Sequence, residues 1–193
     1  MELNEARLGL CVTGSFCNFS KLDAVILSLK ENGITQILPI VSNVCLESEN
    51  RFSTPDTLRE KLKNLTGNDI INTIAKAEPI GPKDMVDILL VLPCTGNTIG
   101  KLSHGITDGP VLMAIKSHIR NNKPVVIGVS TNDGLGASAE NIGKLLNTKN
   151  MYFVPFSQDD PKKKPKSLVC DYNLVVDTLK EAINGRQIQP ILI

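Results

Sequence analysis

The feature that most constrains the fold is a set of short apolar segments, each of which leads into small polar residues. Asp87–Pro93 is the clearest, because it is apolar on both faces, as strands inside a parallel sheet are. Val125–Ser130 has the same character, and Leu8–Val12 and Ile37–Ser42 are shorter examples. Amphipathic stretches separate these segments. The alternation predicts an α/β fold, a three-layer Rossmann-like or flavodoxin-like domain with a mostly parallel sheet flanked by helices.

The intervening stretches carry helix signals. Apolar residues recur with a period of about 3.6 from Phe19 to Leu29, and Gly33 is a plausible stop. Ser53–Asp56 combines a hydroxyl cap, a proline and an acid, so a helix should begin there and end at Thr66–Asn68. The remaining expectations are a short helix over Asp69–Ala77, a helix opening at Thr95–Thr98, helices over Val111–Arg120, through Ile142–Leu146 and over Leu174–Ile183, and a last strand over Met151–Pro155.

The composition excludes several functional classes. A chain of 193 residues suits one α/β domain, here 1–193, and a net charge of +1 argues against nucleic acid or an anionic membrane as partner. Tryptophan is absent and aromatic residues make up 4%, which disfavours stacking on nucleic acid bases. Five cysteines without a C-x-x-C pair and two distant histidines predict reduced thiols in a cytosol and no structural metal. No apolar run approaches the roughly 18 residues of a membrane span.

A ligand site is expected where the strands end. The carboxyl ends of parallel strands share one edge, which brings together Thr13–Ser15, Ser42 and Pro93–Thr98. The first turn can hold a phosphate through its amides, its hydroxyls and the helix dipole. Ser42 stands where a dinucleotide fold has an acid, and the G-x-G-x-x-G spacing is missing, so NAD is disfavoured. The alternatives are an ordinary strand-to-helix turn and a serine that only ends a strand.

Two C-terminal segments admit two interpretations each. The loop that contains Lys162–Lys166 is either a solvated surface or a cationic flap over a dianionic substrate. The apolar tail Ile188–Ile193 is expected to pack on a neighbouring chain or on its own body.

Three of these edge segments resemble a known family. Val12–Ser15, then Pro93–Thr98 with Lys101 and Gly105–Asp108, then Ser130–Asn132, are similar to the flavoprotein family of homo-oligomeric flavin-containing cysteine decarboxylases. The family's Pro-Ala-Ser/Thr-Ala-Asn-Thr turn appears here with Cys94 and Gly96 in its small positions. The resemblance extends over nearly the whole chain.

The resemblance implies FMN and a homo-oligomer. It places the phosphate near Gly14, Ser15 and Ser42, and the Pro93–Thr98 turn against the flavin ring. The residues expected to bind the cofactor are Thr13, Gly14, Ser15, Phe16, Ser42, Pro93, Cys94, Thr95, Gly96, Asn97, Thr98, Ser130 and Asn132.

The resemblance also implies a reaction. With a nicotinamide-binding partner subunit, such a protein oxidises a dihydrodipicolinate-type intermediate to pyridine-2,6-dicarboxylate, a small dicarboxylate, during spore formation. Lys101 or Lys162–Lys166 could supply cations for the two carboxylates, and the proton acceptor stays open between His104, Asp133 and water. The alternative is a binding or assembly subunit in which the partner's nicotinamide does the redox chemistry.

Two departures from the family pattern disfavour decarboxylation. Residues 43–87 contain no histidine, although the decarboxylases use one from this stretch, and Val129–Asn132 keeps only the asparagine of their Pro-Ala-Met-Asn clamp. Cys94 has no lysine or histidine beside it in sequence, so we expect a buried small side chain rather than a nucleophile.

Overall fold

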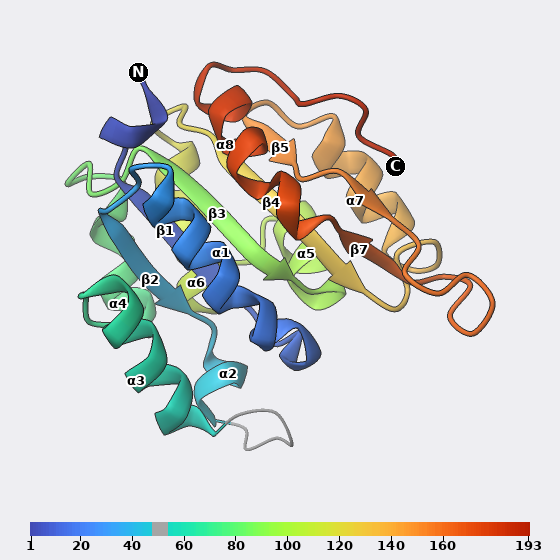
Figure 1. Ribbon diagram of the computed structural model, residues 1–193, viewed down its shortest axis with the longest axis horizontal. Helices are drawn as coiled ribbons and strands as arrows, with labels where there is room; N and C mark the ends of the chain where they lie inside the picture. The colour runs from blue at the N-terminus through green and yellow to red at the C-terminus, as the bar shows by residue number, and fades with distance from the viewer. Residues whose placement is uncertain (48–53) are drawn as a thin grey trace.

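A seven-stranded sheet forms the centre of the computed structural model, which describes residues 1–47 and 54–193 (Figure 1). Its parallel strands lie in the order β2 (Ile37–Val41), β1 (Leu8–Val12), β3 (Ile88–Cys94), β4 (Val125–Thr131) and β5 (Met151–Phe153). The predicted α/β fold with a mostly parallel sheet is confirmed. From β1 the chain goes to one side to form β2 and returns to the other side to form β3. The gap between the carboxyl ends of β1 and β3 is therefore the topological switch point, where ligands bind in such sheets.

Two short antiparallel strands complete the sheet and were not expected from the sequence. β5 pairs with the first half of β4, whereas β7 (Leu168–Cys170) runs antiparallel to its second half, at Ser130 and Thr131. β6 (Phe156–Ser157) then pairs antiparallel with β7. The strand expected over Met151–Pro155 is correspondingly shorter and ends at Phe153.

Helices cover both faces of the sheet. In Figure 1, α1 (Phe19–Glu31) and α8 (Val175–Ile183) lie in front of it, and α5 (Gly96–Ser103), α6 (Pro110–Ile119) and α7 (Ala139–Leu146) lie behind it. The remaining helices are α2 (Asn43–Glu47), α3 (Pro55–Thr66), α4 (Ile74–Ala77) and 3-10 turns at Leu3–Glu5, Phe16–Asn18, Glu78–Ile80 and Tyr172–Leu174.

The predicted start and stop residues are found at the ends of α1 and α3. The apolar stripe of α1 is buried, and Gly33 follows the helix at φ +85°. Thr54 and Thr57 form a capping box at the start of α3, and Gly67 ends that helix in the left-handed conformation. Ser53, which we included in this helix start, lies outside the described residues.

The helix expected over Asp69–Ala77 is wrong in its first half. Ile71 is extended and bonded to β2, because its N–H donates to the Pro39 carbonyl and its own carbonyl accepts the Val41 N–H, both at 2.9 Å. Pairing with the sheet satisfies backbone groups that a helix would otherwise satisfy. Only Ile74–Ala77 is helical.

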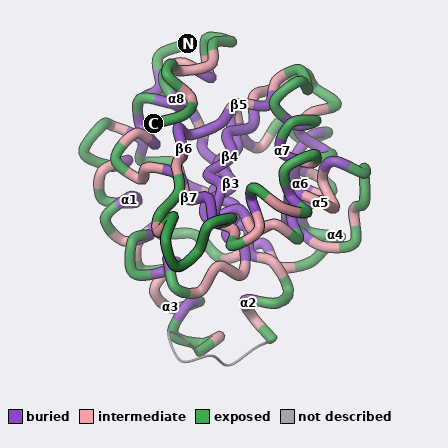
Figure 2. The backbone as a smooth tube through the Cα atoms, turned by 90° about the vertical axis from the view of Figure 1, so that its right-hand side faces the viewer, coloured by how far each residue is buried: buried purple, intermediate pink, exposed green. Residues whose placement is uncertain are grey.

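β3 and the first six residues of β4 form the centre of the core. Figure 2 shows both strands as buried, and all seven residues of β3 are inaccessible or nearly so. Each buried Val, Leu or Ile stabilises the fold by about 1.5–3 kcal/mol relative to exposure. Gly128 lacks a side chain because an added Cβ there would overlap the Leu92 Cδ1. Adjacent strands thus fit against one another without space for a further methyl group.

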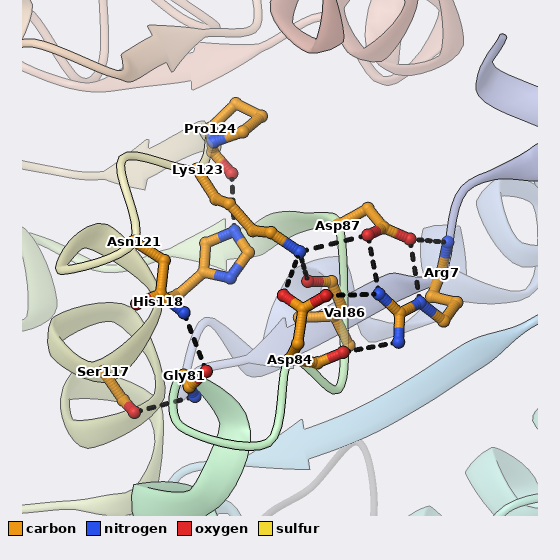
Figure 3. A network of polar contacts seen from close by, with 10 residues as sticks. All are labelled: Arg7, Gly81, Asp84, Val86, Asp87, Ser117, His118, Asn121, Lys123 and Pro124. Carbon is orange, nitrogen blue, oxygen red and sulfur yellow. Dashed lines mark hydrogen bonds and ion pairs between the residues drawn. The ribbon is translucent and has the colours of Figure 1, made fainter. Parts of the chain in front are cut away.

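A charged network joins the amino ends of three strands, at the edge opposite the switch point (Figure 3). Arg7, before β1, donates through N–H and Nε to Asp87 Oδ2, each at 2.9 Å, and through Nη2 to Oδ1 at 2.8 Å. Lys123, before β4, donates to Asp87 and to the Val86 carbonyl. Asp84 pairs with both cations. These contacts hold the starts of β1, β3 and β4 together.

The C-terminal tail lies on the protein's own body. The Phe156 N–H donates to the Ile191 carbonyl at 3.0 Å, and the Ile193 N–H donates back to Phe156 at 3.3 Å. The Leu192 side chain nevertheless stays 67% exposed. Among the described residues, no helix is both long enough and apolar enough to cross a membrane.

Candidate functional site

A cavity of about 560 Å³ opens at the carboxyl ends of β1, β2 and β3, at the switch point. It brings together six of the residues expected from the sequence, namely Thr13, Gly14, Ser42, Thr95, Asn97 and Thr98. We call it the first cavity. Its size is within the range of small-molecule and cofactor sites.

Thr13 is a connector between strands. Its hydroxyl donates to the Pro93 carbonyl at 2.7 Å and accepts the Thr95 N–H at 3.1 Å. The side chain is 1% exposed. The single proton of the Thr13 hydroxyl thus holds β1 to β3 in this structure. A role for Thr13 in binding the cofactor stays a prediction.

Two helix N-termini supply the donors of the first cavity. Thr95 caps α5 by accepting the Thr98 N–H at 3.3 Å, which leaves the amide of Asn97, a residue that lines the cavity, directed out of the helix end. The start of α6, at Val111 and Leu112, lines the same cavity. Both helix ends carry a partial positive charge, which favours an anion at this end of the cavity. The carboxylate of Glu47 also lines the cavity, so an anion would bind at the helix ends rather than beside Glu47.

The cationic side chain at this cavity is already paired. Lys101 Nζ lies 2.6 Å from Asp108 Oδ2, and both residues line the cavity. The Ser42 hydroxyl lies 3.2 Å from Cys45 Sγ, a weak partner that leaves it able to donate to a ligand. A phosphate here would be held mainly by amides and hydroxyls.

Seven expected residues do not line the first cavity, and four of them, Phe16, Pro93, Cys94 and Gly96, are held by other contacts. Pro93 and Cys94 are buried in β3, and desolvation raises the pKa of the Cys94 thiol well above its usual range, so it is no nucleophile. Phe16 packs edge-to-face on Phe19 with ring centroids 5.4 Å apart. At Gly96 the structure shows a steric reason for a small residue, independent of any ligand. A Cβ there would lie within 2.9 Å of Asp133 Oδ1 and still closer to two hydroxyl oxygens of the β4–α7 region.

Ser15, Ser130 and Asn132 lie in a different, second cavity of about 320 Å³. The cause is a tight turn at Gly14, which the Ser15 N–H closes by donating to the Thr13 carbonyl at 2.8 Å. The turn separates Thr13 from Ser15, so the single edge predicted from the sequence is divided into two cavities.

Sequence reasoning missed residues in both cavities. The segment Gly105–Asp108, which carries part of the family resemblance, was a usable signal for Val111 and Leu112, because the helix that starts directly after it brings them to the same cavity. Nothing in the local sequence indicates Lys21, which is brought to the second cavity by tertiary structure.

Comparison with known proteins identifies the family. The Flavoprotein family model matches residues 1–184. This chain belongs to the Flavoprotein family. The B subunit of dipicolinate synthase from Bacillus subtilis (strain 168) is 42% identical over 192 residues, covering 100% of this chain and 96% of that relative.

Solved structures of flavoproteins agree with this assignment. The crystal structure of the dipicolinate synthase B subunit from Bacillus halodurans superposes with a TM-score of 0.90 at 39% identity, covering 100% of this chain and 98% of that one. The FMN-dependent cysteine decarboxylase SpaF has a TM-score of 0.68 at 20% identity, covering 93% of this chain and 98% of that one, a likeness of fold alone.

Proposed function

We propose that this flavoprotein is the FMN-binding subunit of a dipicolinate synthase. Together with the nicotinamide-binding A subunit of that enzyme, it oxidises dihydrodipicolinate to dipicolinate, pyridine-2,6-dicarboxylate, in a spore-forming cell. The observation that carries this proposal is the full-length relationship to the B subunit of dipicolinate synthase, which leaves no substantial part of either chain unmatched. We further propose that the chain acts as a homo-oligomer in the cytosol.

The first cavity suits FMN in its donor chemistry. The amide of Asn97 and the hydroxyl of Ser42 would bind the phosphate or the polar edge of the ring, and Thr98 offers a further hydroxyl. FMN, when bound, would supply an acceptor for the two electrons that leave the substrate ring. The chain's own task is then to orient the substrate, exclude water and accept a proton.

Cysteine decarboxylation is disfavoured by the structure as well as by the sequence. Among the described residues that line the first cavity, none is a histidine. His104 Nδ1 lies 2.8 Å from the Gly100 carbonyl at the far end of α5, and His118 is buried beside Pro124 at the opposite edge of the sheet. The cavity thus lacks the proton-handling group that the decarboxylases use.

A non-redox assembly role is the second candidate. Leu192 and Ile193 expose apolar side chains that an interface with another chain would cover. In that case the partner's nicotinamide would carry all of the redox chemistry.

The two candidates differ in where the electrons go. We expect the purified complex to show a flavin absorbance band that bleaches when dihydrodipicolinate is added without oxygen. Asn97→Ala should weaken FMN binding by about tenfold, the loss of one hydrogen bond, while the complex still assembles. Asn147→Ala, an exposed asparagine at the end of α7, is the matched control. A complex that turns over with no flavin bound would establish the assembly role instead.

A further inference from the structure

The second cavity has the chemistry of a carboxylate site. It lies at the carboxyl ends of β1 and β4, across the Gly14 turn from the first cavity, and Lys21, Lys164, Asn18 and Asn132 line it. We propose that this cavity binds the dicarboxylate substrate, with Lys21 and Lys164 as the cationic partners of its two carboxylates. The identity of the ligand rests on the proposed function, whereas the cationic site rests on the contacts described below.

Lys21 contributes a positive charge to this cavity. Its Nζ lies 4.7 Å from the centroid of the Tyr172 ring, a cation–π contact that positions the ammonium group at the cavity. None of the ion pairs in the described part of the chain includes Lys21. An aromatic face satisfies an ammonium group only in part, so its N–H donors remain available to an anion.

Lys164 reaches the cavity from the loop between β6 and β7. Its Nζ lies 3.3 Å from Asp159 Oδ2, and both side chains are partly exposed. Hydrogen bonding from Ser167, followed by Lys164, lowers the pKa of Asp159, so this carboxylate is ionised at neutral pH. Two ammonium groups against one carboxylate leave the cavity with a net positive charge. Exposed ion pairs are weak, so Lys164 can exchange Asp159 for a ligand carboxylate.

The cavity wall also holds one hydroxyl proton with only a weak acceptor. Asn18 Nδ2 donates to Ser15 Oγ at 3.1 Å and to Ser130 Oγ at 2.8 Å, and the two hydroxyl oxygens lie 2.7 Å apart. Both amide protons of Asn18 are thereby used, and one serine donates to the other. When Ser130 donates to Ser15, the remaining hydroxyl proton is that of Ser15, and its neighbour Cys17 Sγ, 4.0 Å from Ser15 Oγ, is a weak acceptor. A carboxylate oxygen would take that proton.

The volume of the second cavity limits the size of the anion that it can bind. About 320 Å³ lies at the small end of the range for ligand sites, which suits one aromatic ring with its substituents and excludes a dinucleotide. A planar ring with two carboxylates matches two separate cations on different elements, α1 and the β6–β7 loop.

The test uses the chain in complex with its partner subunit, saturated with FMN. Calorimetric titration compares pyridine-2,6-dicarboxylate with pyridine-2-carboxylate, which lacks one carboxylate. Lys21→Gln and Lys164→Gln should each weaken binding of the dicarboxylate by about ten- to a hundredfold, the loss of one charge-assisted hydrogen bond. Lys30→Gln on α1 and Lys163→Gln in the same loop, both exposed, are the matched controls and should bind as the wild type does.

The two ligands make the test specific. If one lysine contacts the second carboxylate, replacing that lysine should remove most of the difference in affinity between the two ligands, because the two changes delete the same interaction. Equal losses in the control variants, or unchanged affinity in Lys21→Gln and Lys164→Gln, would overturn the proposal.

FMN titration of the same variants separates this site from the cofactor site. Both lysine variants should bind FMN like the wild type. Loss of FMN binding with dicarboxylate binding intact would overturn the substrate site and assign the second cavity to the cofactor phosphate. A wild-type complex that binds no FMN, yet loses the dicarboxylate in the lysine variants, would retain this site and reject the proposed flavin chemistry.

Discussion

Close contacts at single residues decide which substitutions this chain can accept. At Gly81 an added Cβ would overlap the Ser117 carbonyl oxygen and lie 2.7 Å from the Ser117 Oγ. The Gly81 N–H also donates to that Oγ at 2.9 Å, which fixes the distance between the two residues. This contact joins the segment before β3 to α6. Backbone oxygens cannot move aside as the end of a flexible side chain can.

We therefore expect Gly81→Ala to lower the free energy of unfolding by about 3 kcal/mol. The urea unfolding midpoint measures this effect. Gly143→Ala is the control, because nothing lies within 4 Å of its added Cβ and it is inside α7. That substitution should leave the protein equally stable or raise its stability by up to about 1 kcal/mol. Equal midpoints for the two variants would contradict the close contact at Gly81.

Residue roles were predictable only where neighbours in sequence determine them. The inert, buried thiol of Cys94 followed from its apolar strand and from the lack of a basic neighbour. The role of Thr13 could not be predicted, because its hydrogen-bond acceptor, the Pro93 carbonyl, is 80 positions away in sequence. The steric neighbours of Gly96 could not be predicted either, because they belong to the end of β4 and the segment after it.

At the scale of elements, the network at the amino ends of β1, β3 and β4 aligns three strands whose carboxyl ends form the cavities. Asp87 is its centre, since it accepts from the backbone and side chain of Arg7 and from Lys123. Its side chain is only 11% exposed. Arg7, the largest contributor, and Lys123 hold the pKa of Asp87 far below its usual range.

Asp87→Asn should lower the free energy of unfolding by about 2–3 kcal/mol, because it removes the charge that two partly buried cations share. Chemical denaturation at pH 7 provides the measurement. Asp69→Asn removes an exposed ion pair with Lys63 and should leave the midpoint almost unchanged. Equal destabilisation by both substitutions would show that the network adds nothing beyond surface charge.

Strands with a continuous apolar sequence were predicted. Short strands that form only because they hydrogen-bond to a neighbouring strand were not. β1, β2, β3 and β4 are apolar on both faces, which is a property of the sequence itself. β6 and β7 have two and three residues and exist because β4 offers backbone groups for pairing at Ser130 and Thr131. The lost half of the Asp69–Ala77 helix has the same explanation, since β2 binds Ile71.

At the scale of the whole molecule, one buried histidine connects stability to pH. His118 is 1% exposed, its Nε2–H donates to the Pro124 carbonyl at 3.1 Å, and its buried Nδ1 has no partner among the described residues. Desolvation lowers the pKa of His118 to about 4 from its usual 6.5. The folded protein thus holds this imidazole neutral over a range in which the unfolded chain protonates it.

Stability should therefore fall as the pH is lowered from about 6.5 to 4, because the unfolded state binds the extra proton. The depressed pKa of His118 corresponds to about 3 kcal/mol over this range. Below about pH 4 the paired carboxylates, Asp87 above all, add a further loss as they protonate. His118→Gln should flatten the upper part of a plot of unfolding free energy against pH and leave the lower part unchanged. A variant with the wild-type slope between pH 6.5 and 4 would assign the effect to other groups.

The site as a whole was predictable to the level of the sheet edge. Parallel strands bring their ends together whatever the side chains are, so the strand pattern alone places Thr13, Ser42 and Asn97 near one another. The division at Gly14 could not be foreseen, because a single turn hydrogen bond sends Ser15 to the other side. Lys21 belongs to the second cavity only because α1 lies beside Tyr172, about 150 positions later in the chain.

The arrangement of Arg7, Asp87 and Lys123 has a consequence for how this protein can diverge. These ionic contacts lie at one rim of the sheet and both cavities lie at the other, with the strands between them. Substitutions in the cavities that change ligand preference therefore leave the charged network of Arg7, Asp87 and Lys123 intact. Such a layout lets new specificities accumulate, through evolution or laboratory selection, without a parallel erosion of the scaffold.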